Sequence, residues 1–179
     1  MYATALLIRV FKIVSISAIG IMALIIVIGN VTDYYTNYYF VAHVMQMDTV
    51  YPDGNMDYRK ITNPLIFHSA YILLITLEVF MTFFCIKGSW ILLKAVKMDA
   101  STFNNAKNWS VAGLIIGIFI WFFGFQVVGG EWFAMWQSST WNGLNSADRI
   151  VTFLVLILIL LQFKDEALPN EQERKNSHE

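Results

Sequence analysis

Charged side chains are scarce in this chain of 179 residues. Asp, Glu, Lys and Arg make up 14% of the sequence, against roughly 25% in soluble proteins. Hydrophobic residues make up 57% of it, and the formal net charge is −1. This composition excludes an ordinary soluble domain, and without a basic excess nothing favours a contact with nucleic acid.

Cysteine and histidine are scarce as well. The one cysteine, Cys85, cannot form an intrachain disulfide, and its apolar surroundings make it a poor nucleophile. Spacings typical of zinc sites, such as CxxC, HxxxH or HExxH, do not occur. The residues from which a metal site could be assembled are His43, Asp48, His68, Asp33 and Glu131. We therefore predict no metal, no cofactor and no catalytic residue.

Long apolar runs, by contrast, are frequent. A helix of about 20 apolar residues rises 1.5 Å per residue and crosses the roughly 30 Å hydrocarbon layer. Such runs occupy about 6–29, 64–86, 109–128 and 147–163. No small-x-small cleavage site follows the first run, so we expect an uncleaved span. The sequence predicts an all-α membrane protein with a four-transmembrane-helix bundle in residues 1–163 and a charged, disordered tail at 164–179.

Basic residues are divided unevenly between the two sides that four spans create. If both termini share a side, that side holds nine of the twelve: Arg9, Lys12, Lys87, Lys94, Lys97, Lys107, Lys164, Arg174 and Lys175. The other side holds Arg59, Lys60 and Arg149. The positive-inside rule therefore predicts an N-in/C-in topology with two aromatic-rich extracytoplasmic loops. We expect Arg9 and Lys12 to snorkel toward the interface.

The second apolar run carries a carboxylic acid near its middle. Glu78 would cost about 2.5–3.5 kcal/mol at that depth, so it needs a compensating role. Its helix carries an intramembrane polar stripe, which consists of Glu78, Tyr71, Thr82, Cys85 and, beside them, His68. Such a stripe should face protein and not lipid. Two roles stay open for Glu78: a neutral acid that hydrogen-bonds a neighbouring helix, and a proton or ligand carrier.

Both predicted outer loops are rich in aromatic and polar side chains. We expect them to form interfacial belts that fold against the membrane surface. In the first loop, helical spacing places Tyr35, Tyr38, Ala42 and Met45 on one side of a short helix. In the second, Glu131 and Arg149 could pair across the base. The candidate binding residues of these loops are Asp33, His43, Asp48, Glu131, Trp132, Trp136, Gln137, Trp141, Asn142 and Arg149.

Small residues in the third run predict a close helix contact. Gly113 and Gly117 form a GxxxG motif, and Gly124 lies on the same side. We favour packing inside the bundle over a homodimer face.

The two loops also carry long sequence motifs. Positions 30–49 read NVTDYYTNYYFVAHVMQMDT, and positions 129–143 read GGEWFAMWQSSTWNG. Together with Glu78 and Arg149, these motifs resemble a bacterial family of predicted small integral membrane proteins with a domain of unknown function. The resemblance covers nearly the whole chain and implies a multi-pass protein of the bacterial inner membrane with four helices. It implies no activity.

Three functions are compatible with these features. We favour a non-catalytic accessory, assembly or interaction protein, whose partners are the lipid bilayer and another membrane protein or a second copy. It predicts that Glu78 packs and pairs and that no cavity reaches it. The alternative is a small proton-coupled transporter or carrier using Glu78, which predicts a cavity down to this residue. A quinone- or redox-associated protein has the least support.

Overall fold

The computed structural model describes residues 2–52 and 54–168 of the chain. All regular elements in these residues are helical. They are α1 (Tyr2–Thr32), α2 (Tyr34–Gln46), η1 (Asp57–Arg59), α3 (Pro64–Ala95), α4 (Ala100–Asn105), α5 (Asn108–Ile118), η2 (Phe119–Trp132), η3 (Met135–Gln137) and α6 (Leu144–Gln162). The predicted all-α class is confirmed.

Four helical stretches are long and apolar enough to cross a membrane. They are Ala3–Thr32, Pro64–Ala95, Ala100–Trp132 and Leu144–Gln162. The third combines α4, α5 and η2. The predicted set of four spans is therefore confirmed. Each of the first three helical stretches extends beyond its predicted span, because helix formation continues into the polar residues that flank the apolar run.

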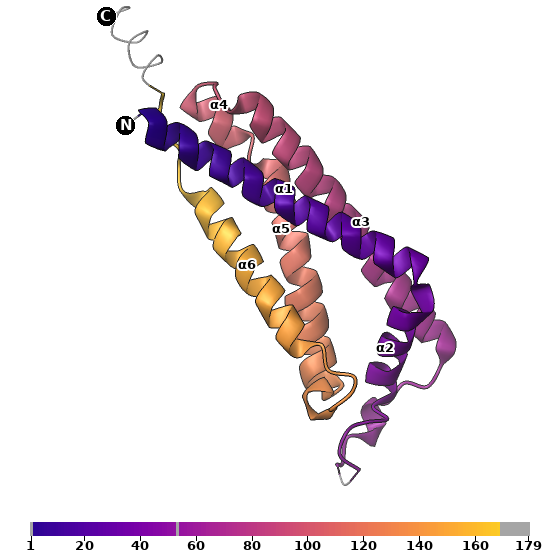
Figure 1. Ribbon diagram of the computed structural model, residues 1–179. Helices are drawn as coiled ribbons and strands as arrows, with labels where there is room; N and C mark the ends of the chain where they lie inside the picture. Colours follow the sequence, from indigo (N-terminus) through magenta and orange to yellow (C-terminus); the bar gives the residue numbers. More distant parts are fainter. Residues whose placement is uncertain (1, 53, 169–179) are drawn as a thin grey trace, which may run out of the picture.

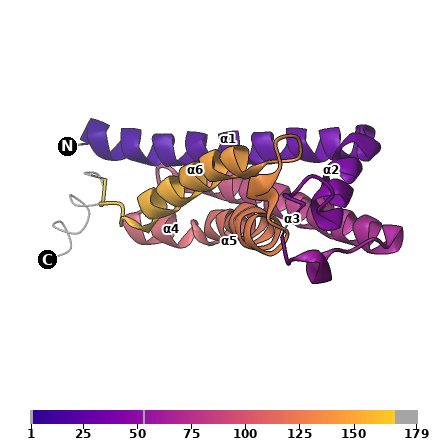
Figure 2. The ribbon, with the colours of Figure 1, turned by 90° about the horizontal axis from the view of Figure 1, so that it is seen from below.

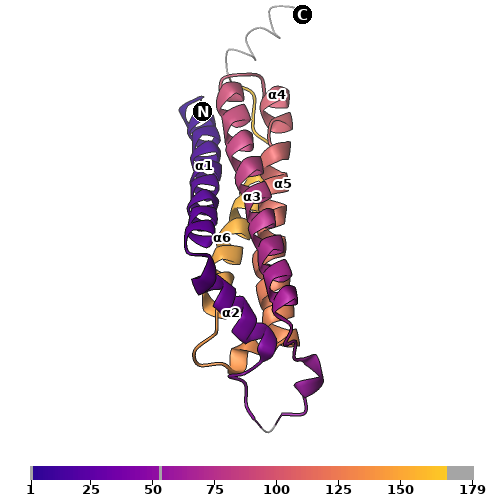
Figure 3. The same cartoon turned by 90° about the vertical axis from the view of Figure 1, so that its right-hand side faces the viewer.

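The long helices lie side by side along one bundle (Figures 1 and 2). Helix α3 lies between α1 and α5 and packs against both, while α6 packs against α5 and η2. The start of α1 and the end of α6 lie at one end, which we call the termini end. Helix α2 continues from α1 at the opposite end, the α2 end, and packs against α3 (Figure 3). Which end faces the cytoplasm stays a prediction from the charge distribution.

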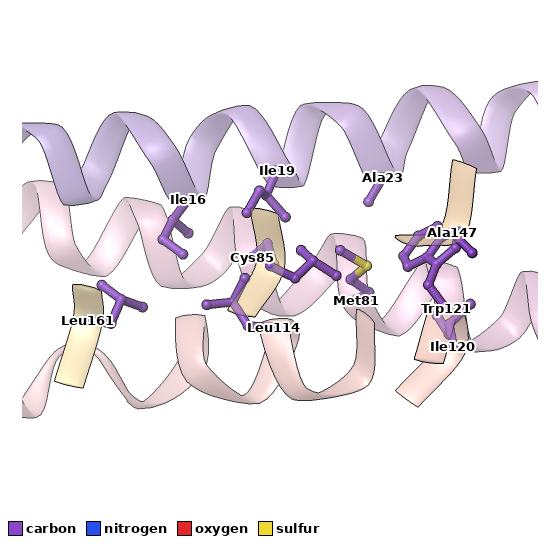
Figure 4. Close-up of a cluster of buried hydrophobic side chains, with 11 residues drawn as sticks. Ile16, Ile19, Ala23, Met81, Cys85, Leu114, Ile120, Trp121, Ala147 and Leu161 are labelled. Carbon is purple, nitrogen blue, oxygen red and sulfur yellow. The ribbon is translucent and has the colours of Figure 1, made fainter. Parts of the chain in front are cut away.

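Side chains from all four long helices form the core at the centre of the bundle. From α1, Ile16 and Ile19 point toward the other helices; Met81 and Cys85 on α3 and Leu114 on α5 lie across from them (Figure 4). None of these five side chains is more than 6% exposed. Lipid tails are as apolar as these residues, so close packing, not water exclusion, holds this layer together.

Two glycines let α5 approach its neighbours closely. A Cβ atom at Gly113 would lie 2.5 Å from Sγ of Cys85, and one at Gly117 would lie 2.8 Å from Cδ1 of Leu154. Both glycines therefore pack inside the bundle. Gly124 differs, because a Cβ atom there would meet nothing within 4 Å. The packing role expected for Gly124 is not found within the bundle.

The segment η2 continues α5 but winds as a π-helix. Its 14 residues are unusual, since π-helices are mostly single turns and often occur at functional sites. At its end the amide of Phe133 donates to the carbonyl of Val128, which is the i→i+5 pattern of this helix type. The π-helix extends the third span to Trp132, so Gly129 and Gly130 belong to the helix and not to the following loop.

Arg9 and Lys12 turn into the protein, so the prediction that they snorkel to the interface is wrong. Their side chains are 0% and 1% exposed. Arg9 donates to the carbonyls of Val96 (3.1 Å) and Met98 (2.7 Å), and Lys12 donates to that of Phe163 (2.9 Å). These carbonyls lie just past the ends of α3 and α6, where the helix dipole is negative and carbonyls lack intrahelical partners. The two cations therefore cap two helix C-termini.

Asp165 neutralises part of this buried positive charge. Its Oδ2 atom lies 2.7 Å from Nζ of Lys12 and 2.6 Å from Nζ of Lys107, and its side chain is 3% exposed. For residues 164–168, the expectation of a disordered segment has to be corrected. This segment docks on the bundle because two buried lysines require a counter-ion. The rest of the predicted tail, 169–179, lies outside the described residues.

The glycine contacts predict a difference between two otherwise similar substitutions. Gly113→Ala should lower the free energy of unfolding by about 1–3 kcal/mol relative to Gly124→Ala, because only the first adds an atom to a filled site. Both variants gain the same intrinsic preference of alanine for a helix. Thermal unfolding in detergent micelles measures the difference, and equal stabilities would contradict the packing described above.

The buried lysines predict that Asp165 is important for stability. Asp165→Asn should lower the free energy of unfolding by about 3 kcal/mol, because it leaves two buried ammonium groups without a counter-ion. Glu166→Gln is the matched control, since Glu166 is exposed and only its backbone carbonyl is bonded, by Arg9. If both variants unfold like the unmodified protein, Asp165 does not hold this end of the bundle.

Candidate functional site

Glu78 belongs to a hydrogen-bonded network that joins three helices in the α2 half of the bundle. Its side chain is 3% exposed. Asn30 of α1 donates from Nδ2 to Oε2 of Glu78 at 2.6 Å. Asn37 of α2 donates from Nδ2 to Oδ1 of Asn30 at 2.9 Å, and the hydroxyl of Tyr71 donates to the Asn30 carbonyl at 3.1 Å. We call these four residues the Glu78 network.

Local geometry explains why the network forms at this place. Asn30 lies in the last turn of α1, where backbone carbonyls lack intrahelical partners, so its carbonyl is available to Tyr71. Tyr71 and Glu78 are seven residues apart on α3 and share one face of the helix. The chain turns at Asp33, and the turn brings Asn37 of α2 back over Asn30.

The polar stripe of α3 faces protein. Tyr71, Glu78, Thr82 and Cys85 are between 0% and 8% exposed. Thr82 donates from its hydroxyl to the Glu78 carbonyl at 2.8 Å. His68 is half-buried beyond Tyr71, on the side away from Glu78. The carboxyl group of this stripe is therefore surrounded by protein, which supplies hydrogen-bond partners that a lipid could not supply.

A cavity of about 160 Å³ reaches Glu78, and we call it the polar arm. All four residues of the network line it. The remaining lining residues are apolar or aromatic: Ile26, Phe40, Val41, Leu74, Trp121 and Phe125. Only Oε2 of the carboxyl group is hydrogen-bonded in the described part of the chain, by Asn30. The other oxygen, Oε1, is therefore free to bind a molecule in the polar arm.

A second cavity of about 170 Å³, which we call the apolar arm, adjoins the first. The two cavities share four lining residues, Phe40, Val41, Leu74 and Phe125. The other residues of the apolar arm are Val44, Met45, Ala70, Gly124, Val128, Gly129, Phe133 and Met135. Together the adjoining arms form an amphipathic site lined by α1, α2, α3 and η2. The space beside Gly124 belongs to this site.

A packed layer separates the polar arm from the termini end. Met81 and Cys85 follow Glu78 by one and two turns of α3 and have no exposed surface. Leu114 of α5 and Leu154 of α6 complete the layer and are equally buried. These four side chains fill the bundle on the termini side of the polar arm.

The structure brings together three of the predicted loop residues. His43 and Asp48 form a pair, with Nδ1 of the histidine 2.5 Å from Oδ2 of the aspartate. The ring of Trp141 stacks on His43 at 4.4 Å between centroids. His68 lies elsewhere, sharing a 2.9 Å hydrogen bond with the hydroxyl of Tyr34. Within residues 2–52 and 54–168, no three His, Cys, Asp or Glu residues are grouped so as to hold a metal ion.

Tyr34 links this histidine to the aromatic surface of α2. Its ring stacks on Tyr38 and on His68, with centroids 6.0 and 5.8 Å apart. Burial, together with the neighbouring hydroxyls of Tyr38 and Tyr35, raises the pKa of Tyr34 above its ordinary value. The phenol therefore stays neutral and acts as a hydrogen-bonding group. On the side of α2 predicted from helical spacing, Tyr35 is 61% exposed, whereas Tyr38 and Met45 are buried.

The predicted pair between Glu131 and Arg149 is not formed in the described part of the chain. Arg59 takes the place of Arg149, donating to the carbonyls of Glu131 and Trp132 at 3.1 and 3.2 Å. The guanidinium also lies 5.1 Å from the ring centroid of Trp132. Hydrogen bonds to two carbonyls need no acid, so Arg59 ties the first outer loop to the end of η2 without an ion pair.

Three further predicted residues have local roles in the loops. Gln137 accepts a hydrogen bond at Oε1 from the amide of Tyr51, which ties the two loops together. The ring of Trp136 meets that of Tyr51 edge to face at 6.3 Å. Asn142 accepts at Oδ1 from the amide of Leu144, the first residue of α6. These contacts position the loops, and none of them reaches Glu78.

Sequence reasoning missed Asn30 and Asn37 as functional residues. The sequence signal that could have found them was their position. Asn30 ends the first apolar run, and Asn37 lies two helical turns further along. Asparagine at the end of a span is common enough to be read as an interfacial residue. Only the packing of α1 and α2 on α3 shows that both amides turn toward Glu78.

Comparison with known proteins identifies the family. The family model described as predicted small integral membrane protein (DUF2165) matches residues 8–164. Because the match covers most of the chain, the chain belongs to this family, and the resemblance inferred from the loop motifs is confirmed. No curated protein and no solved structure matches the chain. It is therefore an integral membrane protein with several spans, and its activity has to be argued from the site.

The network predicts that Asn30 stabilises the protein through Glu78. Asn30→Ala should lower the free energy of unfolding by about 1–3 kcal/mol, because it leaves a buried acceptor without its donor. Asn37→Ala should cost less, since the bond from Asn30 to Glu78 remains. Denaturant unfolding in micelles gives both values.

A double-mutant cycle separates this contact from general packing effects. In a Glu78→Leu background, Asn30→Ala should cost clearly less than in the unmodified protein, because the buried acceptor is already gone. Equal costs in the two backgrounds would show that Asn30 acts independently of Glu78.

Proposed function

We propose that this protein is a small, non-catalytic carrier that binds a ligand beside Glu78 and couples its binding to the proton of that residue. The observation behind the proposal is that the polar arm reaches Glu78 and contacts a carboxyl group with one unpaired oxygen. The accessory-protein hypothesis expects no cavity at this residue. A carrier requires one, so the geometry favours the carrier.

A carboxyl group inside the membrane can exist in two states, and each suits a different occupancy. Without a ligand, the neutral acid is the cheaper form in a low-dielectric site. With a positively charged or hydrogen-donating ligand against Oε1, the ionised form is compensated, so the neutral acid can release its proton and become a carboxylate. Exchange of a proton for a ligand at one residue is the minimal element of coupled transport.

The residues around Glu78 leave this side chain as the group that exchanges the proton for a ligand. The residues facing it are Asn30 from α1, Asn37 from α2, Tyr71 from α3, and Trp121 and Phe125 from η2. Among them Tyr71 is the only other titratable group, and its hydroxyl is bonded to the Asn30 carbonyl. Within residues 2–52 and 54–168, no Lys, Arg, Asp or His residue lines the polar arm beside Glu78.

The direction of access follows from the packed layer and from the charge distribution. The site opens in the α2 half, which the positive-inside rule assigns to the extracytoplasmic side of a bacterial inner membrane. Release to the other side requires the layer of Met81, Cys85, Leu114 and Leu154 to open. The π-helix η2 lines the site and continues from α5, which contributes Leu114 to this layer. A change in the winding of η2 would therefore couple ligand binding to the opening of the layer.

One observation favours the accessory protein as the second candidate. Large aromatic side chains remain exposed around the α2 end: Tyr35, Tyr39, Tyr51, Tyr58, Trp132 and Trp136. Exposed Tyr and Trp residues are typical of interfaces with a membrane surface or with another protein. A membrane-protein partner or a second copy of the chain could bind there. This reading leaves the cavity at Glu78 without a role.

Blocking the apolar arm tests the proposal directly. Ala70 lines this arm, and Ala70→Trp should fill it and abolish retention of a small ligand that copurifies from native membranes. Val79→Trp is the matched control on the same helix, since Val79 is 46% exposed on the outer surface of the bundle. Native mass spectrometry of protein in mild detergent detects the ligand, and an absorption spectrum of the same sample reports a quinone or redox cofactor.

The outcomes distinguish the candidate functions. A small molecule retained by the unmodified protein and by Val79→Trp, but lost from Ala70→Trp, supports a ligand-binding carrier. A stoichiometric membrane protein that is retained equally by both variants supports the accessory function instead. The carrier hypothesis fails if Ala70→Trp retains the same small molecule as the control.

A further inference from the structure

We propose that the ligand of this site is a lipophilic organic cation, with an ammonium group in the polar arm and an apolar group in the apolar arm. The inference rests on the proposed function, since it names the class of ligand that binds beside Glu78. Three properties of the lining residues lead to it, namely their charge, their free hydrogen-bonding groups and their aromatic rings.

The charge of the site is one-sided. Among the described residues, Glu78 is the only acidic or basic one that lines either arm. Its carboxylate therefore has no partner of opposite charge within the protein at this site. A buried carboxylate without a cation is expensive, and a ligand that brings the cation removes that cost. An anionic ligand would add a second uncompensated charge.

The network leaves two acceptor atoms without a hydrogen bond from the described residues. Both amide side chains already donate within the network, Asn30 to Glu78 and Asn37 to Asn30. Oε1 of Glu78 and Oδ1 of Asn37 accept no hydrogen bond from the described residues, and the hydroxyl of Tyr71 donates to a backbone carbonyl. These two free acceptors, one of them on the carboxyl group itself, suit a ligand that donates, as a protonated amine does.

Aromatic rings surround the same space. Phe40, Tyr71, Trp121 and Phe125 all line the polar arm, and they come from α2, α3 and η2. The face of each ring is negative, so rings around a cavity attract a cation, and the attraction is strongest where water is excluded. Trp121 is 5% exposed and Tyr71 is 1% exposed, which places both rings in a dry environment.

The apolar arm selects the rest of the ligand. Its lining residues include Val44, Met45, Phe133 and Met135 and no charged side chain. Methionine is flexible and adapts to ligands of different shape. The arm's volume of about 170 Å³ suits a short alkyl chain or one small ring. The site as a whole therefore suits a small amphiphilic amine.

The test compares three probes with the same alkyl chain. Hexylammonium, hexanol and hexyl sulfate differ in the charge of their polar group. Each is titrated into the purified full-length protein in micelles, and the affinity is obtained from the ligand-induced rise in unfolding temperature. We expect hexylammonium to bind at least about tenfold more tightly than hexanol, because the buried carboxylate gains a partner.

Two variants tie the preference to named side chains. Glu78→Gln keeps a hydrogen-bonding group of the same shape and should remove the advantage of hexylammonium while changing the affinity for hexanol by less than about twofold. Phe125→Leu removes one ring that lines both arms, so it should weaken hexylammonium about threefold more than it weakens hexanol. If Glu78→Gln does not fold, the ring variant still tests the preference.

The possible results separate this inference from the proposed function. Equal binding of hexylammonium and hexanol, both lost in Ala70→Trp, would overturn the cation preference and leave the ligand site intact. Tighter binding of hexyl sulfate would also overturn it. No binding of any probe to the unmodified protein would overturn the inference and count against the proposed function as well.

Discussion

The hydrogen bond from Asn30 to Glu78 is the constraint on which the α2 half of the bundle depends. A carboxyl group at this depth is tolerated only with a partner, and lipid cannot provide one. The partner comes from the last turn of α1, which fixes where α1 must end relative to α3. Asn37 bonds the same amide, so the position of α2 follows from it too. One buried acid thereby orders three helices.

The termini end of the bundle has to compensate buried positive charges, whereas the α2 half compensates a buried acid. Arg9, Lys12 and Lys107 are buried cations at the termini end, and all of them donate to backbone carbonyls or to Asp165. Helix C-termini supply negative dipoles and unpaired carbonyls, which makes them suitable partners. Residues that contribute to the charge bias of the predicted topology therefore also hold the ends of α3 and α6 in place. The same side chains thus contribute both to the predicted topology and to the packing.

Between these ends, packing determines where space is left. At Gly113 and Gly117, α5 comes so close to α3 and α6 that the central layer has no room for a ligand. Where α5 passes into η2, the helix winds differently and Gly124 faces open space. The cavity beside Glu78 lies in this second region. A close-packed half and a half with a cavity in one short bundle are what a carrier with access from one side requires.

The sequence by itself determined the membrane class, the four spans, the polar stripe of α3 and the family. These depend on the length of apolar runs, on helical periodicity and on long loop motifs, all of which are local in the chain. Tertiary structure alone decided the partners: Asn30 and Asn37 for Glu78, helix C-termini for Arg9 and Lys12, Arg59 in place of Arg149, and open space at Gly124. Each of these contacts joins residues on different helices or loops, and their pairing depends on how the helices rotate and end. Composition and spacing carry no information about that, because one helix face can meet any of several neighbours.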